Sequence, residues 1–281
     1  MRYFIKNNYI SDEFCEKLVD DSISAIPQKK DVSIHNSRVF FSSTDFYFNE
    51  LLTKSISWKK LEDLLNSNNF LDFCLENLNI KKDEFFLVNY FKIKKPNTIQ
   101  ENYKKISGTI NKLVPTGSLV KYAALRFFRD IYRKIKFSKI FYPKKKPIEL
   151  LYDFSKAGNG YGRKIHRDSD NRTVTFLLYL NALPQKENQK GGDFDIYEIV
   201  GDNKNAIAPD EKVCKKIKSI SPEAGRLVVF LNENDSYHGV EEMKNFSDYR
   251  YFIYGSFTLL SQKNPYITND SRSKTEFHIY E

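Results

Sequence analysis

Two histidines, one aspartate and one arginine are the residues in this sequence most able to do chemistry together. His166 and Asp168 are separated by one residue, His238 follows Asp168 by 70 residues, and Arg250 comes 12 residues later. Two imidazoles and one carboxylate form a facial triad, which suits Fe(II) and leaves three coordination positions open. An arginine could bind the far carboxylate of a co-substrate, because its planar guanidinium forms two parallel hydrogen bonds to a carboxylate. A His-x-Asp pair alone is weak support, so the argument depends on the segments around it.

Those segments read as short, buried strands separated by turns. β-Branched and aromatic residues fill residues 172–181, and Asn181 and Pro184 bound that run. Similar runs, together with their Gly, Asn or Pro turns, lie within residues 150–166, 191–197 and 221–231, and residues 250–258 form the last such run. Short strands at this spacing favour an all-β sandwich or barrel, and a jelly roll is the form that is open at one mouth.

The order of these features resembles that of the prolyl-4-hydroxylase-like group of Fe(II)- and 2-oxoglutarate-dependent dioxygenases. The resemblance covers about residues 148–260 and also the opening strand and helix start at residues 3–11. It implies a mainly β fold with flanking helices (α+β), in which a double-stranded β-helix, or jelly-roll, core packs against N-terminal helices. It implies His166, Asp168 and His238 as the iron ligands.

The resemblance also implies how the co-substrate is bound. Arg250 is expected to pair with the C5 carboxylate of 2-oxoglutarate, and Tyr179 to donate a hydrogen bond to the same group. Tyr152 and Thr175 fall at positions that line the co-substrate pocket in this group. No further catalytic side chain is expected beyond the metal site.

Two features depart from the family pattern. The loop between His238 and Arg250 is longer than usual, so Arg172 and Arg226 stand next in line as the co-substrate anchor if Arg250 is not. Residues 203–218 are rich in charge and predict an exposed excursion.

Composition limits the class of protein. Cys15, Cys74 and Cys214 are widely spaced and form no CxxC motif, which argues against a disulfide framework or a thiolate zinc site and favours a reducing cytoplasm. The first six residues carry charge within a short apolar stretch, so we expect no secretory signal. The longest uncharged stretch, residues 173–185, is too short and too polar to span a bilayer.

Positive charge is concentrated in one segment. Residues 121–147 contain ten Lys or Arg and one Asp, which equals the net charge of +9 of the whole chain. Residues 119–137 predict an amphipathic helix. Such a helix could contact an anionic surface through residues 121–146, whether a membrane, a nucleic acid or an anionic substrate. The simpler alternative is a solvated helix face packed on the β core.

The N-terminal third predicts supporting structure. Helices are expected over residues 11–26 and 57–77, a strand over 83–93 and a loop over 94–114, and the polar tail is expected to fray at its end. We expect one oxygenase domain over residues 1–281, with N-terminal support (1–93), a basic insertion (94–147), a catalytic core (148–262) and a tail (263–281).

The resulting hypothesis is a cytoplasmic Fe(II)/2-oxoglutarate dioxygenase that uses O2, with ascorbate as an optional reductant. It would hydroxylate an unactivated C–H bond of a peptidyl residue such as proline, or of a small molecule or sugar, and release succinate and CO2. One alternative is a non-catalytic jelly-roll protein that binds a metal or ligand. Another is a nucleic-acid-modifying oxygenase, although that branch typically has a second Arg where this sequence has Ser256.

Overall fold

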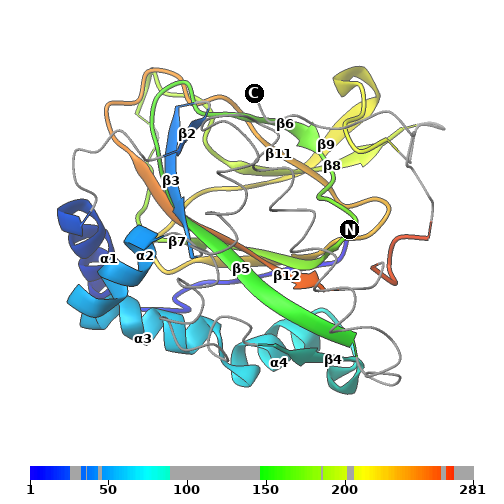
Figure 1. Ribbon diagram of the computed structural model, residues 1–281. Helices are drawn as coiled ribbons and strands as arrows, with labels where there is room; N and C mark the ends of the chain where they lie inside the picture. Colours follow the sequence, from blue (N-terminus) through cyan, green and yellow to red (C-terminus); the bar gives the residue numbers. More distant parts are fainter. Residues whose placement is uncertain are drawn as a thin grey trace, which may run out of the picture.

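Two antiparallel β-sheets face each other, and helices cover the outer face of the larger one (Figure 1). The structure is a computed structural model. It describes residues 1–25, 33–35, 37–43, 46–88, 146–184, 186–200, 206–260 and 264–268. The predicted basic helix at residues 119–137 and the predicted loop at 94–114 lie outside the described residues.

The larger sheet has eight strands in the order β1-β10-β7-β12-β5-β3-β2, with β4 added in parallel beside β5. Their bounds are β1 Tyr3–Lys6, β2 Ser33–His35, β3 Arg38–Ser42, β4 Phe85–Leu87, β5 Lys146–Ala157, β7 Arg172–Tyr179, β10 Leu227–Leu231 and β12 Arg250–Leu259. The long pairing of β12 with β5 and with β7 sets the register of the sheet, with Tyr254 lying between Asp153 and Leu177.

The smaller sheet has four strands in the order β6-β11-β8-β9. Their bounds are β6 Arg163–His166, β8 Phe194–Ile199, β9 Cys214–Ile220 and β11 Tyr237–Val240. Strands β5 to β8 alternate between the larger and the smaller sheet, and strands β9 to β12 alternate between the two sheets again. This double-stranded β-helix, or jelly roll, confirms the predicted fold class.

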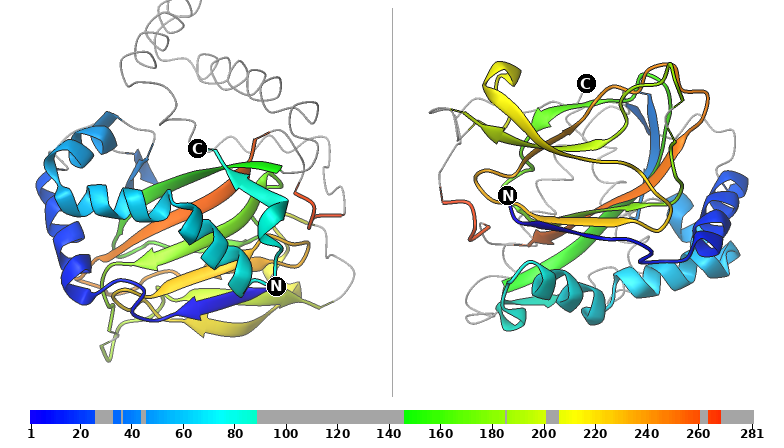
Figure 2. Two further views of the ribbon diagram at one scale, coloured as in Figure 1. Left: turned by 90° about the horizontal axis from the view of Figure 1, so that it is seen from below. Right: turned by 180° about the vertical axis from the view of Figure 1, so that it is seen from behind.

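Four helices line the outer face of the larger sheet (Figure 2): α1 Asp12–Ala25, α2 Phe46–Lys54, α3 Ile56–Leu65 and α4 Asn68–Asn77. The single helix predicted over residues 57–77 is wrong, because the chain ends α3 and starts α4 at Asn66 and Ser67. The Ser67 hydroxyl accepts a hydrogen bond from the backbone N–H of Phe70 (3.0 Å), which caps the new helix. No helix among the described residues is long and apolar enough to cross a membrane.

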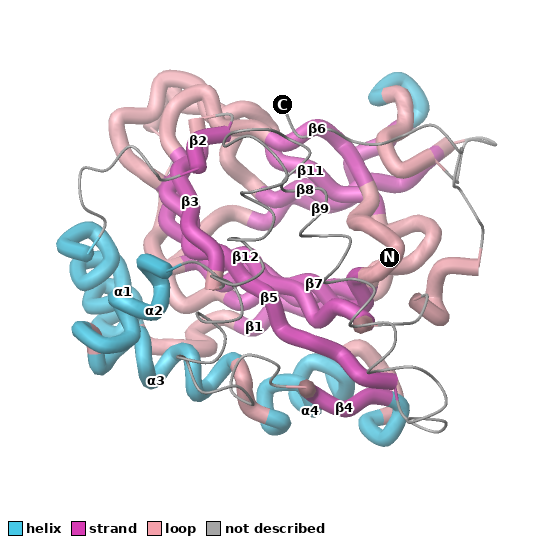
Figure 3. Tube along the Cα trace, viewed as in Figure 1, coloured by secondary structure: helices cyan, strands magenta, loops and turns pink. Residues whose placement is uncertain are grey.

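Figure 3 shows the helices beside the larger sheet and the two sheets facing each other, and buried apolar side chains form two layers in this arrangement. One layer lies between the helices and the larger sheet and includes Trp58, Phe70 and Phe154. The other lies between the two sheets and includes Phe194 and Phe230. Alternate residues of β7 and β12 therefore point to different layers, so strand parity decides which side chains can reach the space between the sheets.

Other segments differ from their predicted form. The expected excursion at residues 203–218 is exposed where it is described, but its end forms the 3-10 turn η2 (Glu211–Val213) and the start of edge strand β9. The predicted strand at residues 83–93 is described as far as residue 88, and it contains the 3-10 turn η1 (Lys82–Glu84) before β4. The predicted tail, residues 263–281, packs against the core near its start: Asn264 is buried, and its side-chain amide donates a hydrogen bond to the carbonyl oxygen of Asn232.

Candidate metal centre

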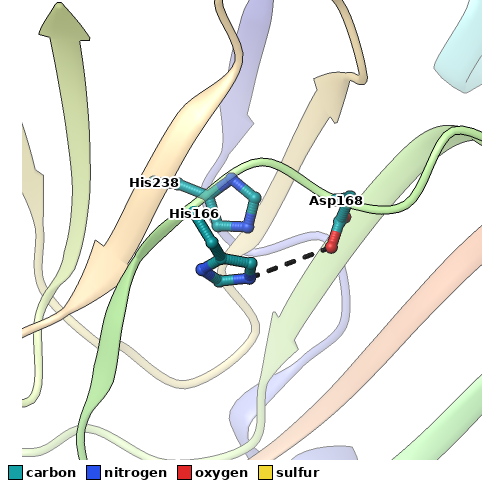
Figure 4. Close-up of side chains that lie close together, drawn as sticks. All are labelled: His166, Asp168 and His238. Atoms are coloured by element: carbon teal, nitrogen blue, oxygen red, sulfur yellow. Dashed lines mark ion pairs between the residues drawn. The ribbon is translucent and has the colours of Figure 1, made fainter. Parts of the chain in front are cut away.

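His166, Asp168 and His238 converge between the two sheets (Figure 4). His166 ends β6, and His238 lies directly opposite it on the neighbouring strand β11. Asp168 lies just beyond His166, where the chain crosses from the smaller sheet to the larger one. One potential ligand atom from each residue lies within 4.8 Å of those of the other two. This spacing is small enough for one ion to contact all three.

The hydrogen bonds of the two imidazoles determine which nitrogen faces the centre. Nδ1 of His166 lies 2.8 Å from the carbonyl oxygen of Lys164, and Nδ1 of His238 lies 3.0 Å from the carbonyl oxygen of Ser236. A carbonyl only accepts, so each Nδ1 carries the proton and each neutral ring has its lone pair on Nε2. The buried Nε2 of His238 has no hydrogen-bond partner among the described residues, as expected of an atom that binds a metal ion.

Charge states at the centre also suit a cation. Burial, followed by the neighbouring His238, lowers the pKa of His166 to about 3, and burial lowers the pKa of His238 as well. Burial alone would raise the pKa of Asp168, but the positive charge of Arg172 and the hydrogen bond from Thr175 hold it well below its usual range. At neutral pH the three side chains therefore present two uncharged nitrogens and one carboxylate.

Arg250, the first residue of β12, is fully buried. Its Nη2 donates to the hydroxyl of Tyr179 (3.1 Å), and its Nη1 donates to the carbonyl oxygen of Gly192 (2.6 Å). The guanidinium carbon lies 4.9 Å from the ring centre of Tyr179 and 4.7 Å from that of Phe252. Its Nε has no partner, and no salt bridge joins Arg250 to any carboxylate of the described residues. A buried guanidinium without a counter-charge is energetically costly, so binding of an anionic ligand would stabilise it.

The other predicted site residues differ in where they lie. The hydroxyl of Thr175 donates to Asp168 (2.7 Å), so Thr175 lies in the site but contacts a metal-binding candidate. Tyr152 does not reach the site, and the prediction that it lines the co-substrate pocket is wrong. Its ring packs edge-on against Phe48, and its hydroxyl bonds to Glu62 of α3, because this position of β5 faces the helices.

The two alternative anchor residues, Arg226 and Arg172, make other contacts. Arg226 bonds to Ser221 (2.7 Å) and Asn7 (2.9 Å) on the outside of the molecule. Arg172 lies beside Asp168, with its Nη1 2.9 Å from Oδ1. Among the described contacts, only the guanidinium of Arg250 is hydrogen-bonded to the hydroxyl of Tyr179; Arg226 reaches Tyr179 only through its backbone carbonyl oxygen.

Sequence reasoning missed two residues that complete the site. The hydroxyl of Tyr254 lies 2.9 Å from Oδ1 and 3.1 Å from Oδ2 of Asp168. Tyr254 follows Arg250 by four residues on β12, so the two-residue period of a strand places both on the same face and could have indicated it. The side chain of Asn232 holds the loop that carries Asp168, and no local pattern in the sequence marks that role.

Comparison with known proteins shows a family similarity over the part of the chain that carries the site. Residues 152–257, which include both histidines, Asp168 and Arg250, match the model of the 2OG-Fe(II) oxygenase superfamily. Over these residues the chain is similar to this superfamily, whose members are oxidoreductases that use Fe(II), 2-oxoglutarate and O2. No curated protein sequence matches the oxygenase.

Solved structures similar to this oxygenase include two prolyl hydroxylases. A Pseudomonas putida prolyl-4-hydroxylase is 13% identical, with 92% of each chain covered and a TM-score of 0.40. A Trichoplax adhaerens prolyl hydroxylase, solved with a hypoxia-inducible-factor peptide, is 15% identical, with 92% of this chain and 83% of that chain covered and a TM-score of 0.42. The carbocyclase SnoK of nogalamycin biosynthesis is 8% identical, with 92% and 80% covered and a TM-score of 0.48.

Proposed function

We propose that this oxygenase hydroxylates an unactivated C–H bond of its substrate, with conversion of 2-oxoglutarate to succinate and CO2. The observation that carries the proposal is the presence of two features in the same chain. One is the centre formed by His166, Asp168 and His238, and the other is the buried guanidinium of Arg250, which lacks a carboxylate partner.

The residues of the centre fit ferrous iron. His166 and His238 would bind it through Nε2, and Asp168 would bind it through Oδ1, which lies 4.0 Å from Nε2 of His166. Three protein ligands on one face leave three positions for exogenous ligands, which is the arrangement that non-haem Fe(II) oxygenases require. Bound iron would couple the reaction of O2 with 2-oxoglutarate to oxidation of the substrate. The apolar rings of Phe194 and Phe230 pack against His238 and exclude water from that side.

Arg250 would bind the C5 carboxylate of 2-oxoglutarate through its fork of N–H donors, assisted by the hydroxyl of Tyr179. Both side chains are buried, so a carboxylate here would be shielded from water and would interact strongly with the guanidinium. The carbonyl oxygen of Gly192 accepts from Nη1 and fixes the plane of the guanidinium. Fixing the far end of the co-substrate leaves its 2-oxo acid end to reach the metal centre.

The substrate would approach over the side of the site that is open to solvent. The side chain of His166 is 18% exposed and that of Arg172 is 30% exposed, whereas Asp168 and His238 are buried. We propose a peptidyl residue such as proline, or a small molecule or sugar, as the substrate. A nucleic-acid substrate is less favoured, because Ser256 stands in place of the second arginine and is buried.

The proposal can be tested without the substrate, by measuring slow, substrate-free turnover of 2-oxoglutarate. Purified protein with Fe(II), O2 and 2-oxoglutarate should form succinate. Asp168→Ala should abolish this turnover, while Asp248→Ala, which removes an exposed carboxylate paired with Lys186, should leave it unchanged. Wild-type protein that forms no succinate under these conditions, or equal rates in the two variants, would contradict the proposal.

A further inference from the structure

The carboxylate of Asp168 is surrounded by hydrogen-bond donors. Arg172 Nη1 lies 2.9 Å from Oδ1, and Thr175 Oγ1 lies 2.7 Å from Oδ2. The hydroxyl of Tyr254 spans the two oxygens, at 2.9 Å from Oδ1 and 3.1 Å from Oδ2. Only 2% of Asp168 is exposed, so protein groups rather than water satisfy this carboxylate.

The number of donors limits how Asp168 can bind a metal. An ionised carboxylate has two oxygens and about four acceptor positions. Three donors leave one of these positions free, and Oδ1 is the oxygen that lies 4.0 Å from Nε2 of His166. The carboxylate can present one oxygen to the metal centre but not both.

Tyr254 is the donor that links the others. It lies on β12, whereas Arg172 and Thr175 belong to the adjacent strand β7. Its hydroxyl also accepts a hydrogen bond from Nη1 of Arg172, and the guanidinium carbon lies 5.3 Å from the centre of its ring. Tyr254 thus holds Arg172 against Asp168 as well as contacting the carboxylate itself. The three donors act as one clamp built from two neighbouring strands.

We infer that Tyr254 is a positioning residue that holds Asp168 as a one-oxygen ligand. This inference rests on the proposed function, in that it takes Asp168 as a metal ligand. Without the Tyr254 hydroxyl, only Thr175 and an Arg172 that has lost its own partner hold the carboxylate, which can then turn about its Cβ–Cγ bond and present both oxygens to the metal. Coordination by both oxygens would fill a position that an exogenous ligand needs. The role of Tyr254 is to preserve the number of open positions.

Binding of Co(II), a spectroscopic substitute for Fe(II), tests the inference without any activity measurement. Tyr254→Phe removes only the hydroxyl. Its matched control is Tyr251→Phe on the same strand, where the side chain points to the opposite face. We expect Tyr254→Phe to bind Co(II) about tenfold more weakly, in the range found when partners of metal ligands are removed. Its visible Co(II) absorption should also weaken, because a carboxylate bound through two oxygens raises the coordination number. Tyr251→Phe should match wild type in both.

A second pair of variants covers the case in which Tyr254→Phe fails to fold. Thr175→Val removes the donor to Oδ2 at nearly constant volume, and Thr175→Ser retains a hydroxyl. Thr175→Val should change affinity and absorption in the same direction, and Thr175→Ser should restore both. Wild-type absorption in the variants that lack a donor would overturn the inference, whatever their affinity. Asp168→Ala separates this result from the proposed function, because unchanged Co(II) binding in that variant would reject the metal site itself.

Discussion

The side-chain amide of Asn232 donates a hydrogen bond to the backbone carbonyl of Ser169 over 2.9 Å, which ties the end of β10 to the loop that carries Asp168. The same amide lies 3.1 Å from the carbonyl oxygen of Arg172. Its Oδ1 accepts from the hydroxyl of Ser236, and the carbonyl of Ser236 accepts from His238. One fully buried asparagine therefore joins the segments that present two of the three metal-binding candidates.

Replacing Asn232 by alanine should reduce both stability and metal affinity. The change removes buried hydrogen bonds to Ser169 and Arg172 and from Ser236, and a typical intramolecular hydrogen bond contributes about 0.5–1.5 kcal/mol. Urea denaturation and Co(II) titration would measure the two effects. Asn234→Ala is the control, because the amide of Asn234 donates only to Thr268 at the surface in the described contacts. Similar values for the two variants would argue against a positioning role for Asn232.

Arg250→Ala should weaken 2-oxoglutarate binding strongly. Loss of a buried charge-assisted pair costs about 2–5 kcal/mol, which is about 30-fold or more in the dissociation constant. Anaerobic titration of the Fe(II) protein with 2-oxoglutarate measures this directly. Arg226→Ala is the matched control, since Arg226 bonds to Asn7 and Ser221 away from the site. Wild-type affinity in Arg250→Ala would assign the anchor to another residue.

Tyr179→Phe should give a smaller loss than Arg250→Ala. The variant keeps the ring that packs against Arg250 and removes only the hydroxyl that would contact the co-substrate carboxylate. A hydrogen bond to a charged group contributes about 1.5–3 kcal/mol, so a roughly tenfold or larger rise in the dissociation constant is expected. The same titration gives the value, and the metal affinity should not change. If 2-oxoglutarate binds Tyr179→Phe as it binds wild type, Tyr179 is a core residue only.

The metal-free protein should lose stability as the pH falls from about 6.5 toward 4. Burial lowers the pKa of His166 from 6.5 to about 3, and it also lowers that of His238. In this range the unfolded chain takes up protons that the folded chain does not, so the free energy of unfolding decreases as the pH falls. Asp168, whose usual pKa is 3.8 and whose folded pKa is lower, adds its effect only at more acidic pH.

Urea denaturation of the metal-free protein at several pH values checks this slope. A variant with both His166→Asn and His238→Asn should show a shallower dependence over the same range, because it lacks the two buried imidazoles. An equal slope in the variant and in wild type would show that other groups control the acid response.

How much of the site could be predicted depended on the kind of contact involved. His166, Asp168, His238, Arg250 and Tyr179 sit in motifs whose order along the chain is specific. The structure places the ligand atoms of the first three within 4.8 Å of one another and joins Arg250 to Tyr179 by a hydrogen bond. Tyr152 was placed wrongly because β5 is covered on both faces. Its residues are buried at most positions, so the alternation that would reveal which face a side chain occupies is absent.

Other contacts depend on strand register, which local patterns do not encode. Tyr254 reaches Asp168 only because β12 pairs with β7 in one register, which places Leu177 opposite Tyr254. The short strands β2 and β3 and the helix α2 were not predicted, since three to nine residues give little periodic signal. The division of the predicted helix at Ser67 is a capping event that an Asn-Ser-Asn sequence permits but does not require.

The central claim is that one metal-binding centre and one buried arginine bind Fe(II) and 2-oxoglutarate together. The most direct test is anaerobic absorption spectroscopy. Adding 2-oxoglutarate to the Fe(II)-loaded protein should produce a visible metal-to-ligand charge-transfer band that saturates at one equivalent. The band should be absent in His166→Ala and His238→Ala, and in Arg250→Ala it should appear only at much higher 2-oxoglutarate concentrations. A wild-type protein that gives no such band, or a band that persists unchanged in the histidine variants, would contradict the account.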